Sequence, residues 1–417
     1  MTEDNVIVIP TPDQLDPLTA LLRDGARKLL AQAVDAELET FLAAYKDLKD
    51  DRGRRAVVRN GYLPQRQGMT GLGEVSVHVP KTRDRSGSHL HFTSSLIPPY
   101  LKRTKSVETL LPVLYLKGIS TGDFQEALSA LLGEDAAGLS AATISRLKAT
   151  WKTEYETWKR RDLSKSRYAY VWADGIYFNV RGEDDKQCIL ALIGATEHGV
   201  KEFIAICDGY RESEQSWLEM LVSLKHRGLH TAPKLAIGDG ALGFWKALRQ
   251  VYPQTCHQRC WVHKTRHVLD KVPKSIQSHV KAAVQEIWRS PTRELAQTAF
   301  KTFSRMYSAK YPQAVESGET ELDDLLTFYD FPAEHWQHIR TTNPIESTFA
   351  TVRLRTAKTR GCGSRTTILS MVFKLGQSAE KGWLRLRGYR RLSAVMRGVK
   401  FIDGVEEQEV TKGRQVA

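Results

Sequence analysis

Three Asp-Gly pairs, at Asp174, Asp208 and Asp239, punctuate the middle of the sequence. Asp-Gly is turn chemistry first, so each pair needs further context before it indicates a reaction. Asp174 lies inside the apolar stretch "VWADGIYF", where a carboxylate is costly unless a metal ion or hydrogen bonds compensate. Asp239 ends the short apolar stretch "KLAIGDG", and α/β sheets bind ligands beyond such strand ends. Asp208 is followed by "GYRESE" and is interpreted as an exit turn, which leaves Asp174 and Asp239 as candidates.

A third candidate carboxylate, Glu346, lies in the stretch "TTNPIES". Asn343 is expected to cap a helix, with Pro344 in its first turn and Glu346 reaching back toward the cap. The same placement would put Glu346 at the mouth of a site shared with Asp174 and Asp239. Hard carboxylate oxygens suit Mg²⁺, which takes one or two carboxylates together with substrate phosphates. Two such ions, about 4 Å apart, can activate an attacking oxygen and stabilise a leaving oxygen at phosphorus.

Positive charge is concentrated in one part of the chain. The 417 residues carry a formal charge of +13. Residues 351–400 hold 13 Lys or Arg and one acid, Glu380, so this segment alone accounts for +12. Such a field suits a polyanion such as nucleic acid; a solvated cationic helix face is the alternative. The basic residues directly after Glu346 are the candidate DNA contacts: Arg353, Arg355, Lys358 and Arg360.

The remaining composition indicates a soluble intracellular protein. Five cysteines are scattered along a long chain, which argues against a disulfide framework and for a reducing compartment. The acidic N-terminus "MTEDNVIVIPTPDQ" lacks the apolar core of a signal peptide. No apolar run approaches the roughly 18 residues that a membrane span needs.

The pattern of apolar residues predicts an α/β core around the candidate acids. Strands are expected over "YAYVWADGIYFNV", "QCILALIGATE" and "KEFIAICDG", followed by the helix "SEQSWLEMLVSLKHRGL", the strand "KLAIGDG" and the helix "ALGFWKALRQVY". This order suits a mixed sheet with helices against it. The core is expected in two parts, residues 166–254 and 341–402, with a helical insertion over 255–340 and a tail over 403–417. From 344 onward a long basic helix is expected to close the domain.

The N-terminal part is expected to bind DNA. A helical region over 1–50 precedes a basic β-containing segment over 51–103 that includes the strand-like "EVSVHVP". Residues 104–165 return to helix. "STGDFQEALSALLG" and the helix after Ser140 form a helix-turn-helix pattern that would expose Arg146 and Lys148, although any helical hairpin would look similar.

At this point the sequence resembles a known family. "GDGALGFWKALRQVYPQTCHQRCWVHKTRHVLDKVP" and "FYDFPAEHWQHIRTTNPIESTFATVRLRTAKTRGCGS" resemble the Mutator-type transposases of bacterial insertion sequences, as do "RNGY", "VHVPKTRDR" and "LYLKGISTGDFQEAL". The resemblance covers roughly residues 50–395. It implies a ribonuclease H-like mixed sheet with an Asp/Asp/Glu triad, which falls on Asp174, Asp239 and Glu346, and an all-helical insertion before the Glu. The family's Cys-x-x-His element falls on Cys260 and His263.

The stretch "CHQRCWVH" followed by His267 also invites a zinc interpretation. Cys256, Cys260, His263 and His267 have the spacing of one stripe on a single helix, about 16 Å long. Zinc needs four ligands within about 2.3 Å, which one straight helix cannot supply. A broken helix, or a zinc pair with outside ligands, remains open. The alternative is that Cys260 and His263 pack or hydrogen-bond near the active centre, with Asn343 also in a supporting role. At His267 related sequences often have Asn.

Together these observations predict a DNA transposase that recognises the terminal inverted repeats of its insertion sequence. It would cleave and join double-stranded DNA ends with two Mg²⁺ or Mn²⁺ ions, act as a homodimer, and work near the nucleoid in the cytoplasm of a bacterium. Three alternatives stay open. They are a ribonuclease H-like nuclease without strand transfer, a domesticated DNA-binding regulator, and a hydrolase using Ser120 of "GISTG", whose apolar flank has helical rather than strand spacing.

Overall fold

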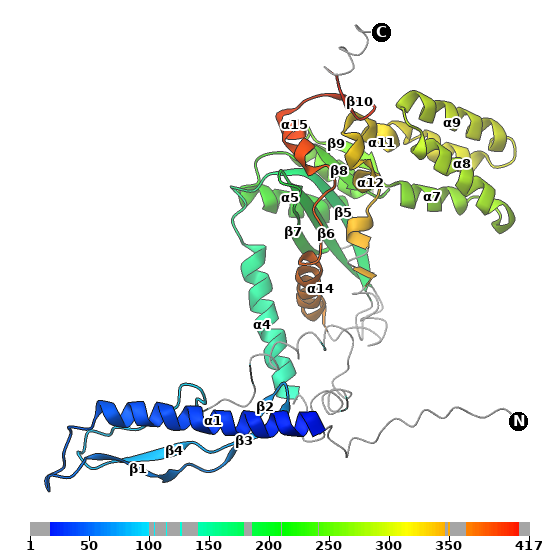
Figure 1. The fold of residues 1–417 in the computed structure, drawn as a ribbon. Coiled ribbons are helices and arrows are strands. Elements are labelled where there is room, and N and C mark those ends of the chain that lie inside the picture. The colour runs from blue at the N-terminus through cyan, green and yellow to red at the C-terminus, as the bar shows by residue number, and fades with distance from the viewer. Residues whose placement is uncertain are drawn as a thin grey trace, which may run out of the picture. The chain divides into compact units, whose positions relative to one another are not determined.

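The computed structural model describes residues 17–99, 104, 114, 126, 141–178, 186–209, 211–240, 242–346, 349–350 and 364–407 (Figure 1). The chain divides into two compact units, Met1–Leu147 and Lys148–Ala417. None of the helices among these described residues is long and apolar enough to cross a membrane.

The first unit is built on the long helix α1 (Pro17–Ala44). Two antiparallel ladders accompany it: β1 (Val57–Tyr62) pairs with β4 (Pro80–Asp84), and β2 (Arg66–Thr70) pairs with β3 (Gly73–Val77). The predicted helix followed by a β-containing segment is confirmed. The strand expected over "EVSVHVP" ends at Val77, however, and Pro80 already begins the next strand.

The core of this unit is small. Val34 of α1 packs with Val79 and Ile97, all nearly inaccessible to solvent. Glu37, one helical turn from Val34, accepts hydrogen bonds from the hydroxyl groups of Ser94 and Ser95. These bonds hold the loop after β4 against α1, so apolar burial and a charge-assisted contact act at the same place.

The predicted helix-turn-helix is described only in part. Its second helix is α4 (Ala141–Lys159), in agreement with the expected helix after Ser140. The first helix of the pair, together with Ser120 of the "GISTG" stretch, lies outside the described residues. DNA recognition by this segment therefore stays a prediction.

The second unit contains a five-stranded mixed sheet of strand order β7-β6-β5-β8-β9. The strands β5 (Tyr168–Phe178), β6 (Gln187–Thr196) and β7 (Lys201–Gly209) are antiparallel, whereas β5, β8 (Leu235–Gly238) and β9 (Cys256–Arg259) are parallel. The first four strands were predicted and are confirmed. Both β5 and β6 are buried along almost their whole length, as expected for strands covered on both faces.

The strand β9 corrects one expectation. Cys256 to Arg259 pair in parallel with Leu235 to Gly238 of β8 instead of continuing a helix, and α7 (Trp261–Leu269) begins only after the N-cap residue Cys260. The single helix expected to carry Cys256, Cys260, His263 and His267 is therefore wrong. The pairing partner of β9 lies about twenty residues away in sequence, so local periodicity could not reveal this strand.

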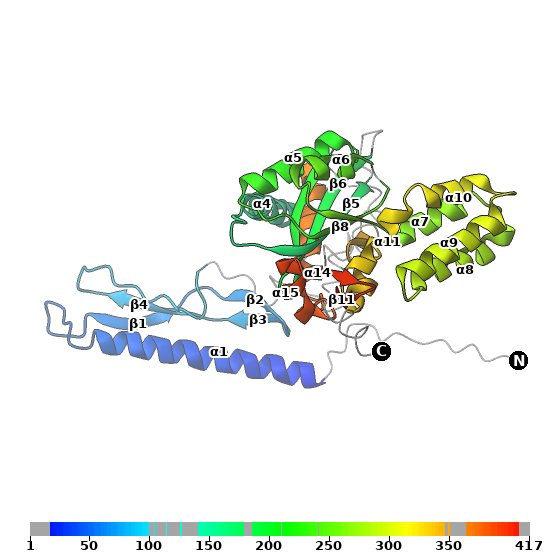
Figure 2. The same ribbon diagram turned by 90° about the horizontal axis from the view of Figure 1, so that it is seen from above.

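Helices cover both faces of the sheet (Figure 2). One face packs against α5 (Glu214–His226) and α6 (Leu242–Val251), with Trp217 and Trp245 fully buried. The other face packs against α14 (Arg365–Glu380), where Phe203 of β7 lies against Phe349 and Trp383. The result is a helix–sheet–helix arrangement, the layered mixed core that the sequence predicts.

Side chains donate hydrogen bonds to backbone carbonyl groups of β7, the strand at one edge of the sheet. The hydroxyl of Tyr155 donates to the carbonyl of Ile206 at 2.8 Å. Arg161 and Arg227 donate to the carbonyls of Phe203 and Ile204, at 2.5 and 3.3 Å. An edge strand with filled carbonyls is a poor template for pairing with another chain. The Tyr155 bond also fixes the C-terminal half of α4 to the sheet.

A helical segment leaves the sheet after β9 (Figure 1), and its end is tied back to its start by a hydrogen bond from Trp261 N to Arg340 O at 2.9 Å. Its elements are α7, η1 (Lys274–Ile276), α8 (Gln277–Arg289), α9 (Arg293–Tyr307), α10 (Pro312–Glu319), α11 (Leu322–Leu326), η2 (Thr327–Asp330), η3 (Ala333–His335) and α12 (Trp336–Ile339). The mostly helical character predicted for this region is confirmed, with the helices starting at Trp261.

Two expectations about the C-terminal part are corrected. Residues 343–346 and 349–350 are helical, but Ser364 has extended backbone angles and caps α14 through Thr367 N, so one continuous helix from 344 is wrong. Residues 351–363, which include Arg353, Arg355, Lys358 and Arg360, lie outside the described part.

The prediction of a loose tail from residue 403 is also wrong for the first residues of that segment. After α15 (Leu392–Arg397), the strands β10 (Phe401–Ile402) and β11 (Val405–Glu406) form a hairpin. Asp403 accepts a hydrogen bond from Arg293 N at 2.7 Å, and Gly404 N donates to Tyr329 O at 3.1 Å. This hairpin is tied to the helical segment.

Candidate functional site

Asp174 and Asp239 come from neighbouring parallel strands. The ladder between β5 and β8 pairs Tyr170 with Leu235 and Trp172 with Ile237. Asp174 lies two residues beyond Trp172, and Asp239 lies two residues beyond Ile237. Since paired positions in adjacent strands are about 5 Å apart, this register brings Asp174, in the middle of β5, to the same level as Asp239, just past the carboxyl end of β8. Asp174 is only 6% exposed.

The backbone at Asp239 is held from two sides. Its carbonyl accepts hydrogen bonds from Trp245 Nε1 at 2.9 Å and from Arg259 Nη1 at 2.6 Å. The Arg259 guanidinium also lies over the Trp245 ring, 4.9 Å from its centroid. Trp245 comes from α6 and Arg259 from β9, so both elements that flank Asp239 fix the turn in which it lies.

Glu346 lies in a short helical turn whose cap differs from the expected one. The carbonyl of Thr342 accepts hydrogen bonds from Ile345 N at 2.9 Å and Glu346 N at 3.2 Å. Thr342 therefore occupies the cap position, and Asn343 is the first helical residue. The cap assigned to Asn343 is wrong by one position, because Thr and Asn are both common caps and the pattern does not separate them.

Thr342 connects three candidate functional residues. Its fully buried hydroxyl lies 3.0 Å from Glu346 Oε1, 3.3 Å from Cys260 Sγ and 3.4 Å from His263 Nδ1. A hydroxyl has one proton, so it donates to one of these neighbours at a time. Thr342 N also donates to Cys260 Sγ at 3.3 Å.

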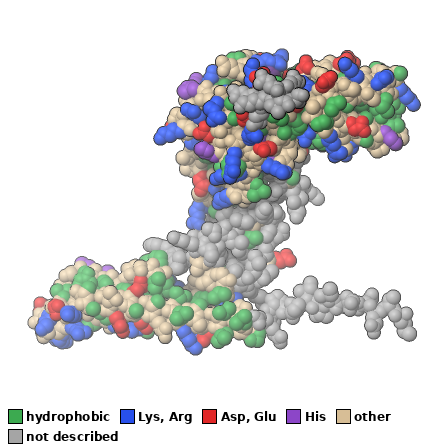
Figure 3. Space-filling view, turned by 45° about the horizontal axis from the view of Figure 1, so that its top comes forward, with side chains coloured by type: hydrophobic (Ala, Val, Ile, Leu, Met, Phe, Trp, Pro, Cys, Tyr) green, Lys and Arg blue, Asp and Glu red, His purple; other side chains and the backbone are tan. Residues whose placement is uncertain are grey.

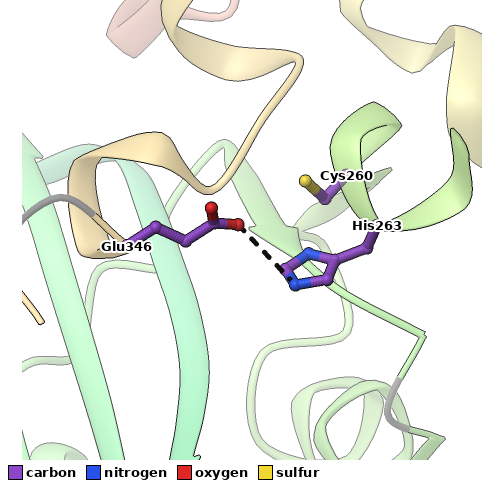
Figure 4. Close-up of side chains that lie close together, drawn as sticks. All are labelled: Cys260, His263 and Glu346. Carbon is purple, nitrogen blue, oxygen red and sulfur yellow. Dashed lines mark ion pairs between the residues drawn. The ribbon is translucent and has the colours of Figure 1, made fainter. Parts of the chain in front are cut away.

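Cys260, His263 and Glu346 form a compact cluster (Figure 4). His263 Nε2 is 3.6 Å from Glu346 Oε1, and one ligand atom from each of the three residues lies within 4.8 Å of the others. Sulfur, nitrogen and oxygen at this spacing are compatible with a metal ion. The structure thus brings Cys260 and His263 to Glu346, as expected of supporting residues.

His263 links this cluster to the two aspartates. A hydrogen bond between His263 and Cys260 raises the pKa of His263 to about 9 against the effect of burial, and the negative charges of Asp239 and Asp174 act in the same direction as that bond. The imidazole is therefore protonated at neutral pH and pairs with Glu346, 3.6 Å away. This positive charge offsets part of the repulsion among the acids.

Glu212 is a fourth acid at this place, and the sequence pattern did not single it out. It immediately precedes Ser213, the N-cap of α5. Burial, followed by the negative charges of Asp239 and Asp174, raises the pKa of Glu212 to about 7. Two signals in the sequence could have pointed to it: the acidic stretch "GYRESE", which contains Glu212, and Gly175, an isolated glycine inside a strand of the kind that marks close approach.

Other predicted residues lie elsewhere. Cys256 is exposed on β9, and the cluster found among the described residues does not include it or His267. Asn343 is exposed. Arg146 is exposed on α4 and Lys148 is half-buried there. Four zinc ligands from Cys256, Cys260, His263 and His267 are therefore not brought together.

A cavity of about 590 Å³ opens beside this cluster, between α7, α8 and residues 337–343. Trp261 and Trp288 provide aromatic surface in its wall, and Arg266, Lys281 and Arg340 provide positive charge. The Arg340 guanidinium lies 5.0 Å from the Trp288 ring centroid. Asn343, three residues before Glu346, also lines the cavity. Aromatic rings and cations together suit stacked, single-stranded nucleotides.

The surface around the described core carries mixed charge. Figure 3 shows basic and acidic side chains interspersed over the visible face of residues 148–417. The described residues on this face thus show no single uniform basic patch, and the basic segment over 351–400 is described only in part. Four of its members, the Arg and Lys residues between 353 and 360, lie outside the described residues.

Comparison with known proteins identifies the family. The sequence matches the family described as "Transposase, Mutator family" over residues 5–385. It is 53% identical over 281 residues to the transposase for insertion sequence element IST2 of Acidithiobacillus ferrooxidans, covering 67% of this chain and 95% of that protein. It is 50% identical over 295 residues to the transposase for insertion sequence element IS6120 of Mycolicibacterium smegmatis, covering 71% and 91%.

More distant relatives found by sequence are also transposases of insertion sequences. The transposase for insertion sequence element ISRM5 of Rhizobium meliloti is 28% identical over 376 residues, covering 88% of this chain and 90% of that one. Among solved structures, the Drosophila P element transposase strand transfer complex matches 74% of this chain and 91% of that chain at 11% identity and a TM-score of 0.25, which is too low to establish a shared fold. On the sequence matches, the chain belongs to the Mutator family of transposases.

Proposed function

We propose that this transposase cleaves and joins DNA at the ends of its insertion sequence, using Asp174, Asp239 and Glu346 as a metal-binding triad. The observation that carries the proposal is the convergence at one end of the sheet. Asp174 and Asp239 come from neighbouring parallel strands, and the protonated His263, which pairs with Glu346, lies within the field of both. Three acids that are far apart in sequence thus share one electrostatic environment.

The donor set fits a hard divalent cation. Asp174 is a buried carboxylate, and Glu212 Oε2 is buried without a hydrogen-bond partner among the described residues. Oxygen donors that are held out of water and crowded by like charge suit Mg²⁺ or Mn²⁺. Two such ions, when bound, would supply activation of the attacking oxygen and stabilisation of the leaving oxygen at phosphorus.

The chain's own residues position the acids for this chemistry. Trp245 and Arg259 hold the backbone of Asp239, and Thr342 and His263 hold the Glu346 carboxylate. Phosphoryl transfer depends mainly on such positioning and on electrostatic stabilisation. A preorganised carboxylate set needs little rearrangement when the scissile phosphate enters.

The sheet supports a ribonuclease H-like assignment for the core. Three antiparallel strands are followed by two parallel ones, with one candidate acid in the first strand and another just after the fourth. Helices cover both faces, and the helical segment lies between Asp239 and Glu346. This matches the organisation that the family resemblance implies.

Double-stranded DNA is the proposed substrate and target. The basic segment after Glu346 would hold the strand near the acids, and the N-terminal unit with α4 would recognise terminal inverted repeats. The cavity with Trp261 and Trp288 would accept bases of the flanking strand. A homodimer is expected, because transposition brings two ends together.

Substitution of the triad tests this function. Asp174→Asn or Asp239→Asn should lower the rate of cleavage at the element's ends by at least about 100-fold, because each removes a charge needed for phosphoryl transfer. Asp208→Asn is the matched control, since Asp208 also precedes Gly at a strand end but is exposed on β7. Cleavage would be followed on labelled end fragments with Mg²⁺ or Mn²⁺.

The same assay separates the alternatives. Full cleavage by Asp174→Asn would contradict the proposed mechanism, and retained activity in Asp239→Ala would favour a hydrolase using Ser120. Pre-cut ends carrying a free 3′-hydroxyl should be joined to target DNA. A protein that cleaves but cannot join them would be a nuclease, and one that binds ends without turnover would be a DNA-binding regulator.

A further inference from the structure

Glu212 is enclosed by β5, which carries Asp174, and by α6, which begins shortly after Asp239. A Cβ atom added to Gly175, the residue after Asp174, would lie 2.3 Å from Glu212 Cδ. A Cβ atom added to Gly243, at the start of α6 after Asp239, would lie 2.4 Å from the Glu212 carbonyl oxygen. Both glycines therefore leave the space that Glu212 fills. Contacts on two sides therefore fix the position of Glu212.

The Glu212 carboxylate has an incomplete set of partners. Tyr177 of β5 contributes a side-chain hydrogen bond to it. Oε2 is buried without a hydrogen-bond partner among the described residues. Most buried polar oxygens in proteins are paired, so an oxygen without a partner beside two other acids needs a ligand, a water molecule or a proton.

We propose that Glu212 is a fourth carboxylate of the site and contributes an oxygen ligand, directly or through a coordinated water, to a divalent cation held with Asp174 and Asp239. This inference rests on the proposed metal-dependent function and extends its ligand set. A cation would satisfy the buried Oε2 and neutralise the repulsion between Glu212 and the two aspartates. The competing explanation is a structural carboxyl group that only joins α5 to β5 through Tyr177.

Manganese binding to the full chain separates the two explanations. Glu212→Gln keeps the shape and the Tyr177 contact but removes the charge. It should weaken Mn²⁺ binding, measured from the electron paramagnetic resonance signal of free Mn²⁺, by about 10-fold or more. Glu214→Gln is the matched control, because Glu214 lies two residues away and already pairs with Lys246 at 3.6 Å. It should bind Mn²⁺ like the wild type.

Melting temperatures provide a second readout. Without metal, Glu212→Gln should melt at the wild-type temperature or above it, since it removes repulsion, and the increase in melting temperature on adding Mn²⁺ should be smaller than in the wild type. A lower melting temperature without metal, together with unchanged Mn²⁺ affinity, would establish the structural role and overturn the inference.

Gly175→Ala tests the same contact from the other side. Its methyl group would displace the Glu212 carboxylate and should reproduce the weakened Mn²⁺ binding. In a Glu212→Ala background the methyl group has space, so Gly175→Ala should add little further loss. Equal losses in both backgrounds would show that Gly175 acts independently and would count against the inference.

The inference and the proposed function can fail separately. If the wild-type chain and Asp174→Asn both fail to bind Mn²⁺, the metal-dependent function fails and the ligand role of Glu212 with it. If Asp174→Asn weakens binding while Glu212→Gln does not, the triad stands and only the fourth ligand is wrong.

Discussion

At the residue scale, Thr342 shows how one buried hydroxyl organises the candidate site. It lies within hydrogen-bonding distance of Cys260, His263 and Glu346, while its backbone carbonyl starts the helical turn that carries Glu346. Side-chain and backbone contacts of a single residue therefore set both the position and the orientation of the third acid. It does this without being an acid or a base itself.

Thr342→Val tests this positioning role. Val has the same shape but no hydroxyl, so Glu346 and His263 lose a buried partner. The free energy of unfolding should fall by about 1–3 kcal/mol. The cleavage rate should fall by about 10-fold, and the Mn²⁺ concentration that gives half-maximal rate should rise, because the Glu346 carboxylate is less constrained.

Thr255→Val is a matched control for this substitution. Thr255 is buried as well, but its hydroxyl has no hydrogen-bond partner among the described residues. Replacing it with Val should leave both stability and Mn²⁺ dependence nearly unchanged. Similar losses in the two variants would mean that Thr342 matters only as a buried threonine and not through its contacts.

At the element scale, the packing of α14 on β7 brings two half-buried acids near each other. Burial, followed by the nearby charge of Glu202, raises the pKa of Glu380 to about 7, although Arg161 opposes the shift. Glu380 ends α14, and Glu202 is in β7. The contact between these elements is therefore stronger when Glu380 is protonated.

The pH dependence of stability follows from this shift. Since the folded-state pKa of Glu380 lies above its ordinary value of 4.5, its contribution to stability is complete below about pH 4.5 and is lost as pH rises toward 7. Glu380→Gln cannot ionise. Its melting temperature should exceed that of the wild type at pH 8, and the difference should shrink at pH 5.

Glu219→Gln on α5 serves as the control, because Glu219 is exposed and its replacement leaves the packing of α14 intact. It should follow the wild-type pH profile. If Glu380→Gln differs from the wild type by the same amount at pH 5 and pH 8, ionisation of Glu380 does not destabilise the contact.

At the scale of the whole molecule, the charge distribution predicts how DNA is bound. Residues 351–400 carry +12 of the total +13, and part of this segment directly follows Glu346. A protein that neutralises phosphates releases counterions, so its affinity for DNA falls steeply as salt concentration rises. Most of that salt dependence is expected to come from this segment.

Replacing Arg353 and Arg355 with Gln should therefore reduce the dependence of log affinity on log salt concentration by about 2, close to 0.9 for each phosphate contact. Fluorescence anisotropy with end DNA over a range of salt concentrations would measure it. Lys301 and Arg305, exposed on α9, provide a charge-matched control pair. An equal reduction in the control pair would show that the effect is one of net charge and not of the segment.

The sequence by itself determined the elements whose signals are local. The buried strands around Asp174 and Asp239 are runs of apolar residues, and α5, α6 and the helical segment have amphipathic periodicity, so β5, β6, β7 and β8 were predictable. The candidate triad could be named from local patterns: Asp174 interrupts an apolar strand, Asp239 follows one, and Glu346 lies at the start of a helix. The family resemblance placed the same three residues.

Only the tertiary structure decided what depends on distant partners. The strand β9 exists because β8 pairs with it, and the cap at Thr342 rather than Asn343 is defined by backbone hydrogen bonds. Glu212 joins the acids because Gly175 and Gly243 leave space for it. Local periodicity indicates which face of an element is apolar, but it does not indicate which elements pack against each other. Those packing contacts place Cys260, His263, Thr342 and Glu212 at the site.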